Sequence, residues 1–173
     1  MLYLPVACPG SGKSYLAEKM VESHVIPADA VVSPDRYREI LTGNRADQTV
    51  NGPVFKIVDE ILDQRIQHGL DVYLDATNLN AKLRDKMLNR LMKLSADFSL
   101  GVTIFVSDEP REIVERRNVE RFHPVPDDVF NRFYSQAMAF DSTKYILAYG
   151  AEELTFNEML KNIGWDSQRQ EWT

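Results

Sequence analysis

The feature that most constrains the fold is an apolar run followed at once by a glycine-rich turn. Residues 2–6, LYLPV, have the apolar character of a buried strand, and ACPGSGKS follows at 7–14. A helical pattern begins at Gly12, so the turn lies between a strand and a helix. Similar alternation of strand-like and helix-like segments continues along the chain. We therefore predict an α/β fold with a parallel β-sheet flanked by helices.

The predicted elements follow from hydrophobic periodicity and turn residues. Strands are predicted at Leu2–Val6, Ala30–Val32, Val72–Leu74, Val102–Val106 and Glu153–Phe156. Helices are predicted at residues 12–23, 35–41, 54–67, 110–119, 126–140 and 157–163. A further helix is predicted to begin near Ala81 and to bury a stripe made of Leu83, Met87, Leu91 and Leu94.

Length and composition limit the class of protein. The chain has 173 residues, 44% of them hydrophobic, which favours one domain over residues 1–173, with a polar tail at 164–173 that is either loose or docked. No apolar run approaches the roughly 18 residues of a membrane span, so we expect no membrane partner and a cytoplasmic location. The single cysteine, Cys8, excludes an internal disulfide. The net charge of −6 argues against a protein that coats nucleic acid.

The turn at 7–14 fits the P-loop pattern, with Ala7 in place of the usual first glycine. Backbone N–H groups of such a loop converge on phosphate oxygens, and the following helix adds partial positive charge. Lys13 is expected to reach the β- and γ-phosphates and Ser14 to ligate Mg²⁺. The predicted ATP contacts of this segment are Pro9, Gly10, Ser11, Gly12, Lys13, Ser14 and Tyr15.

The loop after the second predicted strand reads SPDRYRE, at residues 33–39. Asp35 and Arg38 are three residues apart and share a helix face. A carboxylate here can accept the proton of an attacking hydroxyl, while the arginine holds the phosphoryl group or the acceptor. The alternative is that Asp35 is only a helix N-cap or an acidic residue in the first turn of a helix, positions where such residues are favoured.

The third predicted strand ends in YLDATNLN, at residues 73–80. Asp75 follows the apolar strand, at the position where a P-loop protein places a carboxylate that organises the Mg²⁺ shell. Thr77 and Asn78 are expected to point into the same cleft and to contact the acceptor. The alternative is an Asx turn that opens the next helix.

The segment ERRNVERFHPVP, at residues 115–126, is predicted to form a lid. Arg117 and Arg121 are four residues apart, so both can approach the ATP phosphates from one face when the lid closes. Positive charge at this place would stabilise the transition state of phosphoryl transfer. The alternative is a solvated helix face, because glutamates are interleaved with the arginines.

Taken together, these segments resemble the kinase of the bacteriophage-type 5′-polynucleotide kinase family and the kinase module of the bacterial end-healing RNA-repair enzyme. The resemblance rests on ACPGSGKS, on Asp35 and Arg38, on ADQTVNG at 46–52, on DATNLN at 75–80 and on RRNVER at 116–121, and it covers roughly residues 1–150. It implies a P-loop kinase-type parallel β-sheet flanked by helices, with an arginine-bearing lid, and a nucleic acid end as the partner.

The resemblance also implies a role for individual residues. Lys13 and Ser14 would bind ATP·Mg²⁺. Asp75, at the end of the third predicted strand, is expected to be the second residue of the metal shell. Asp35 would be the general base and Arg38 the contact to the phosphoryl group or the acceptor phosphate. Arg117 and Arg121 would contact the ATP phosphates, so that the predicted catalytic set is Lys13, Asp35, Arg38 and Arg121. The chain lacks the phosphatase and ligase modules of larger relatives, and a homodimer is left open.

The acceptor is predicted to be a 5′-hydroxyl end of DNA or RNA. Kinases of hydroxymethylated bases in DNA and of small metabolites would share the ATP half of this site, so both stay as alternatives. A third alternative is a non-catalytic module in which ATP switches a partner surface. A basic stripe of Lys82, Lys86, Arg90 and Lys93 leans towards nucleic acid, but an ordinary solvated helix face accounts for it better.

Overall fold

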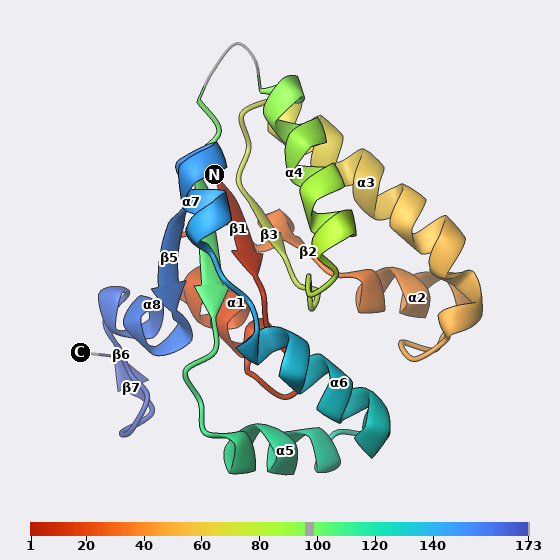
Figure 1. Cartoon of the computed structure of the whole chain (residues 1–173), viewed down its shortest axis with the longest axis vertical. Coiled ribbons are helices and arrows are strands. Elements are labelled where there is room, and N and C mark those ends of the chain that lie inside the picture. Colours follow the sequence, from red (N-terminus) through yellow and green to blue (C-terminus); the bar gives the residue numbers. More distant parts are fainter. Residues whose placement is uncertain (96–98, 173) are drawn as a thin grey trace.

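The computed structural model describes residues 1–95 and 99–172 and contains a five-stranded sheet (Figure 1). All neighbouring strands are parallel, in the order β2-β3-β1-β4-β5. The strands are β1 (Leu2–Pro5), β2 (Val31–Val32), β3 (Val72–Leu74), β4 (Val102–Val106) and β5 (Glu152–Thr155). The α/β prediction of a parallel sheet is therefore confirmed, with each strand within a residue or so of its predicted position.

Helices connect the strands and cover both faces of the sheet. They are α1 (Lys13–Glu22), α2 (Pro34–Thr42), α3 (Asn51–Gln67), α4 (Ala81–Leu94), α5 (Arg111–Val119), α6 (Asp127–Met138), α7 (Thr143–Tyr149) and α8 (Phe156–Asn162). Two short 3-10 turns, Ala28–Ala30 and Gln48–Val50, precede β2 and α3. No helix in the described ranges is long and apolar enough to cross a bilayer.

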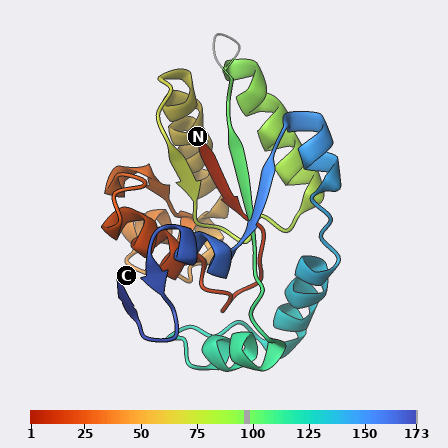
Figure 2. The ribbon, with the colours of Figure 1, turned by 90° about the vertical axis from the view of Figure 1, so that its left-hand side faces the viewer.

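Side chains of the central strands alternate between two cores, as the period of a strand requires. In β1, Leu2 and Leu4 pack with α3 and α4, while Tyr3 faces the opposite core. That opposite core is formed by α1 and α8, which lie side by side on one face of the sheet (Figure 2). Burial on both faces explains why these strands are continuous apolar runs.

The predicted helix at 126–140 is shorter in the structure and is followed by α7, which the sequence did not predict. The chain turns at Asp141, whose carboxylate accepts a hydrogen bond from the Thr143 backbone N–H over 2.9 Å. The new helix ends at Gly150, with φ of 61°. Its aromatic residue Tyr145 is almost fully buried, so tertiary packing stabilises this short helix.

The predicted buried stripe of α4 is wrong at Leu83, whose side chain is 64% exposed. The helix instead buries Arg84, Leu88 and Leu91. The reason is that the Arg84 guanidinium lies over the rings of Phe140 and Tyr145, at 4.8 and 4.9 Å from their centroids. These contacts turn α4 so that the long arginine faces inwards.

The C-terminal tail is docked, up to Trp172. Strands β6 (Trp165–Asp166) and β7 (Glu171–Trp172) form an antiparallel hairpin. The Lys19 ammonium group of α1 lies 4.0 Å from the ring centroid of Trp165 and fixes the hairpin against this helix. Of the predicted tail, Thr173 lies outside the described residues.

Candidate active site

The predicted site residues come from three loops at the carboxyl ends of neighbouring parallel strands. The P-loop joins β1 to α1, the second loop joins β2 to α2, and the third joins β3 to α4 (Figure 1). Because these strands are adjacent in the sheet, their loops meet at one edge. The Thr77 carbonyl accepts a hydrogen bond from the Ala7 N–H over 3.2 Å, which ties the third loop to the P-loop.

The P-loop backbone requires its two glycines. Gly10 and Gly12 have φ of 85° and 90°, in the left-handed region that disfavours side chains. A Cβ on Gly10 would lie 2.3 Å from the Val114 carbonyl oxygen of α5. The loop is further closed by Cys8 and Ser11, whose Sγ and Oγ atoms are 3.2 Å apart and buried. The segment at 111–119 is thus packed directly on the phosphate loop.

Lys13 lies at the start of α1, partly buried beneath the loop. Its Nζ donates a hydrogen bond to the Cys8 carbonyl over 2.7 Å. Burial lowers the pKa of Lys13 to about 8, although the nearby charge of Asp75 acts in the opposite direction. A phosphate group in the loop would place a negative charge next to the Lys13 ammonium group and would favour its protonated form. The environment therefore favours an anionic ligand next to Lys13.

Ser14 and Asp75 are brought together, as the predicted metal shell requires. The Ser14 hydroxyl donates a hydrogen bond to Asp75 Oδ2 over 2.8 Å. Burial raises the pKa of Asp75, while this hydrogen bond and the charge of Lys13 counteract the shift. Two oxygen donors next to a phosphate loop fit Mg²⁺, which prefers few protein ligands and completes its shell with phosphates and water. The residues present thus fit the metal.

Asp35 lies in the first turn of α2 and Arg38 one turn later. The Arg38 guanidinium donates a hydrogen bond to Asp35 Oδ1 over 2.5 Å. Its Nε and Nη2 atoms donate to Asn51 Oδ1 over 3.0 and 2.8 Å. Arg38 is 6% exposed, whereas the Asp35 side chain is 52% exposed. The buried arginine therefore holds a carboxylate that is accessible to a ligand, and its own contact with the phosphoryl group or the acceptor stays a prediction.

The position of Asp35 relative to the P-loop is visible in its electrostatic effects. Its charge raises the pKa of Lys13 and of Asp75, although it is a smaller cause than burial for both. Such an effect on both groups requires that Asp35 lie near them. The three predicted centres, for the phosphates, the metal and the proton, thus lie near one another.

Thr77 and Asn78 lie at the same edge of the sheet, but the Asn78 side chain already makes hydrogen bonds within the protein. Its amide nitrogen donates to the carbonyls of Pro5, Ala76 and Leu74 over 2.8, 3.0 and 3.3 Å. Asn78 has φ of 50°, which asparagine tolerates better than most residues. Asn78 therefore joins the ends of β1 and β3, and the prediction that it contacts the acceptor stays a prediction.

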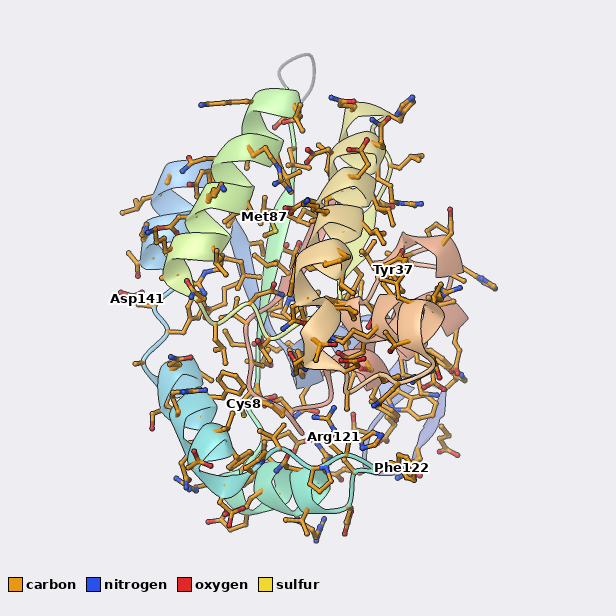
Figure 3. The ribbon with its side chains drawn as sticks, turned by 90° about the vertical axis from the view of Figure 1, so that its right-hand side faces the viewer. Cys8, Tyr37, Met87, Arg121, Phe122 and Asp141 are labelled. Carbon is orange, nitrogen blue, oxygen red and sulfur yellow. The ribbon has the colours of Figure 1, made fainter. Side chains whose placement is uncertain are left out.

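The two predicted lid arginines occupy different positions. Arg117 belongs to α5, and its Nη1 would lie 4.0 Å from a Cβ built on Gly12. Its Nη2 is paired with Glu109 over 3.1 Å. Arg121 lies beyond the end of α5, at the edge of the molecule that carries the P-loop residue Cys8 (Figure 3). The charge of Arg121 acts on Lys13 and Asp75, so it also lies near the site.

Three residues that support the site were not assigned roles from the sequence. Asn51 fixes Arg38, and Glu109 pairs with Arg117. Asn118 is buried and clamps the lid turn, because its side chain donates to the Val125 carbonyl and accepts from the Val125 N–H. Asn51 and Asn118 lie within the motif segments at 46–52 and 116–121, whereas Glu109 lies outside both and had no signal in the sequence.

Tyr15, whose contact with ATP stays a prediction, has its ring against the C-terminal hairpin. Its ring lies edge-on to Trp165 with centroids 6.4 Å apart.

Among the described residues, no group of three or more His, Cys, Asp or Glu side chains could hold a metal. A pair of oxygen ligands supplemented by phosphate is therefore the arrangement that this part of the chain offers.

A glycine-rich phosphate loop between the first strand and first helix of a parallel sheet defines a P-loop domain of α/β class. Residues 6–139 match the model of the family AAA_33, described as an AAA domain. The chain belongs to this family. A search of curated proteins finds no match.

Solved structures show the same fold. A gluconokinase from Sinorhizobium meliloti 1021 is 16% identical with a TM-score of 0.53, and the match covers 94% of this chain and 87% of that one. A protein described as a kinase from Chloroflexus aurantiacus J-10-fl is 12% identical with a TM-score of 0.58, covering 98% and 97%. A sugar kinase from Janibacter sp. HTCC2649 is 16% identical with a TM-score of 0.57, covering 94% and 88%.

Proposed function

We propose that this chain is an ATP-dependent kinase that transfers the γ-phosphate of ATP to a hydroxyl group. The observation that carries the proposal is the exposed Asp35 carboxylate, which the buried Arg38 holds near Lys13 and Asp75. A protein that only binds ATP needs the loop and the metal shell. A carboxylate placed beside them and fixed by an arginine is what an acceptor hydroxyl requires.

The proposed reaction is an in-line transfer. The acceptor oxygen forms a bond to the γ-phosphorus, and the bond from that phosphorus to the β–γ bridging oxygen breaks, giving ADP. Asp35 takes the hydroxyl proton and later releases it to water. The loop N–H groups, Lys13 and the two lid arginines stabilise the charge on the phosphate oxygens. Mg²⁺, held by Ser14 and Asp75, would add charge neutralisation.

Two acceptor classes have support. Among the structural neighbours are proteins named a gluconokinase and a sugar kinase, and this favours a small hydroxyl compound. The Asp35–Arg38 spacing and the segment at 46–52 favour a 5′-hydroxyl end of DNA or RNA, because these are the motifs of the resemblance described above. The names of the structural neighbours give the small compound the stronger support, because the ATP half of the site is common to both kinds of kinase.

The test is transfer of labelled γ-phosphate from ATP·Mg²⁺ to matched acceptors. One set contains gluconate and neutral sugars, a second contains oligonucleotides with 5′-hydroxyl ends, and a third contains 5′-phosphorylated oligonucleotides with hydroxymethylpyrimidines. Label in one set alone identifies the acceptor class. ATP binding with slow hydrolysis and no labelled acceptor in any set would contradict the kinase and support an ATP-dependent switch.

A further inference from the structure

A second open cavity lies next to the site and is not used by the proposed chemistry. It has a volume of about 580 Å³ and lies between the start of α4, the end of α6 and the start of α7. Asp141 marks its position between α4 and α6 in Figure 3. The cavity is widely open to solvent. Side chains that line it include Leu79, Lys82, Arg84, Gln136, Phe140 and Lys144.

The pocket contains a buried cation that has no carboxylate partner. Arg84 is 6% exposed, and within the described ranges it forms no salt bridge. Its Nε donates to the Tyr145 hydroxyl over 2.9 Å and its Nη1 donates to the Asn78 carbonyl. Nη2 has no hydrogen-bond partner among the described residues. The rings of Phe140 and Tyr145 and, through the Tyr145 hydroxyl, the Asp85 carboxylate already compensate part of the Arg84 charge. The unpaired Nη2 donor is therefore what favours an anion in the pocket.

The remaining charges of the pocket do not remove this preference. Lys82 is exposed and has no ion pair with any described residue, so it adds a free positive charge. Lys144 is paired with Asp85, which also accepts from the Tyr145 hydroxyl. Asp141 is the acidic residue in the lining, and its carboxylate accepts from the Thr143 N–H. The lining therefore carries three cationic groups and one anionic group.

The pocket is joined to the site through the loop at 75–80. Leu79 in the lining directly follows Asn78, so their Cα atoms are about 3.8 Å apart. The Asn78 carbonyl holds Arg84, and its amide nitrogen holds the end of β1 just before the P-loop.

We infer that this pocket binds an anionic group of the acceptor, a phosphate or a carboxylate, through Arg84 and Lys82. The inference rests on the proposed kinase function and adds a substrate class to it. A carboxylate would belong to a sugar acid, and a phosphate would belong to the nucleotide that carries a 5′-hydroxyl. Both share the charge that the pocket recognises, and guanidinium groups suit either one.

The test compares acceptors that differ only in the anionic group. Thymidine 3′-monophosphate is compared with thymidine, and gluconate with sorbitol, by phosphate transfer and by calorimetric binding in the presence of a non-hydrolysable ATP analogue and Mg²⁺. We expect the anionic member of one pair to be preferred at least tenfold. The pair that shows the preference identifies the source of the anion. Equal use or equal binding of both members in both pairs, including no binding, overturns the inference.

Two lysines one turn apart on α4 provide a matched control. Lys82 and Lys86 are both exposed and without an ion pair among the described residues, but only Lys82 lines the pocket. Lys82→Gln should weaken binding of the preferred anionic compound about fivefold and leave its neutral counterpart unchanged, as expected for one exposed charged contact. Lys86→Gln should change neither. Equal effects of the two substitutions would overturn the inference.

Arg84→Gln gives a second variant, with thermal unfolding measured first because Arg84 also packs α4. If it folds, it should abolish the preference for the anionic member. The results distinguish a wrong assignment of kinase activity from a wrong assignment of the anion-binding pocket. Transfer to neutral and anionic acceptors alike keeps the kinase and removes the pocket, while anion binding without any transfer keeps the pocket and removes the kinase.

Discussion

Arg38 is oriented by Asn51, whose Oδ1 accepts hydrogen bonds from two nitrogens of the same guanidinium, over 3.0 and 2.8 Å. This relationship links the start of α3 to the proposed base, because the third guanidinium nitrogen holds Asp35. The two residues are 13 positions apart in the chain and belong to different helices. The segment at 46–52 thus acts on the site through Arg38.

Substitution of the proposed base tests the chemistry directly. Asp35→Asn keeps an oxygen that can accept from Arg38 but removes the proton acceptor. We expect kcat to fall by about 10²- to 10⁴-fold, the usual contribution of a general base, with the Kd for ATP unchanged within about twofold. Single-turnover transfer and calorimetric titration with ATP measure the two quantities. A variant that retains near wild-type turnover would show that Asp35 is only a first-turn helix acid.

Asn51→Ala tests the support of Arg38. It leaves Nε and Nη2 of a buried arginine without acceptors, so we expect a loss of about 1–3 kcal/mol in the free energy of unfolding. The acceptor KM should rise as well, because Arg38 loses its fixed orientation. Urea unfolding and steady-state kinetics measure these effects.

Gln48→Ala is the matched control for Asn51→Ala. It removes only the group that accepts from the Asn51 amide nitrogen, over 2.8 Å at the surface. We expect a change within about 0.5 kcal/mol, as for an ordinary surface position. If both substitutions were equally mild, the Arg38–Asn51 contact would contribute nothing measurable.

The depressed pKa of Lys13 predicts how ATP binding depends on pH. Burial lowers this pKa from 10.5 in the unfolded chain to about 8 in the folded protein. The ammonium form, which binds phosphate, is lost from the free protein as the pH rises through about 8. ATP affinity should therefore decline between pH 7.5 and 9.5, a range in which the phosphates are already ionised. Lys13→Met should bind ATP weakly and show no such decline.

The same pKa has a consequence for stability with a definite sign. Between pH 8 and 10.5 the unfolded state binds more protons at Lys13 than the folded state does. The free energy of unfolding contributed by this group therefore rises with pH over that window, and the penalty is fully present below it. Chemical unfolding of wild type and Lys13→Met without nucleotide measures this. Lys13→Met should be the more stable protein at pH 7, and equal stabilities would contradict the lowered pKa.

Gly10→Ala tests the contact between the P-loop and α5. The new Cβ would lie 2.3 Å from the Val114 carbonyl oxygen, and φ of 85° is strained for alanine. We expect a loss of about 2 kcal/mol or more, and about 2–4 °C in Tm for each kcal/mol in a chain of this size. ATP binding should weaken too. Gly52→Ala is the control, because nothing lies within 4 Å of its Cβ; it should be neutral or stabilising.

Much of the fold follows from local pattern. The apolar runs at β1, β3 and β4 are buried on both faces, so their composition alone indicates a parallel sheet. The P-loop was equally readable, since its glycines and Lys13 have fixed spacing and a backbone role. Asp35 and Arg38 were found because they are one helical turn apart and meet through local geometry.

The rest depends on contacts between distant residues. Arg84 is buried because Phe140 and Tyr145 cover it, and no property of α4 alone shows this. The short helix α7 is stabilised by the burial of Tyr145 more than by its own propensity. Asn51 acts by accepting hydrogen bonds from Arg38, and Asn118 acts by hydrogen bonding to the Val125 backbone. Their roles can be recognised only when the position of each partner is known.

The C-terminal hairpin at 165–172 concentrates the optical properties of the protein in one place. The sequence contains two tryptophans, and their rings lie 5.0 Å apart, with Trp165 against the helix that begins at the P-loop. The tryptophan fluorescence of the chain therefore originates beside α1. Displacement of this helix or release of the hairpin would change the emission spectrum, so the native chain carries its own label for either event.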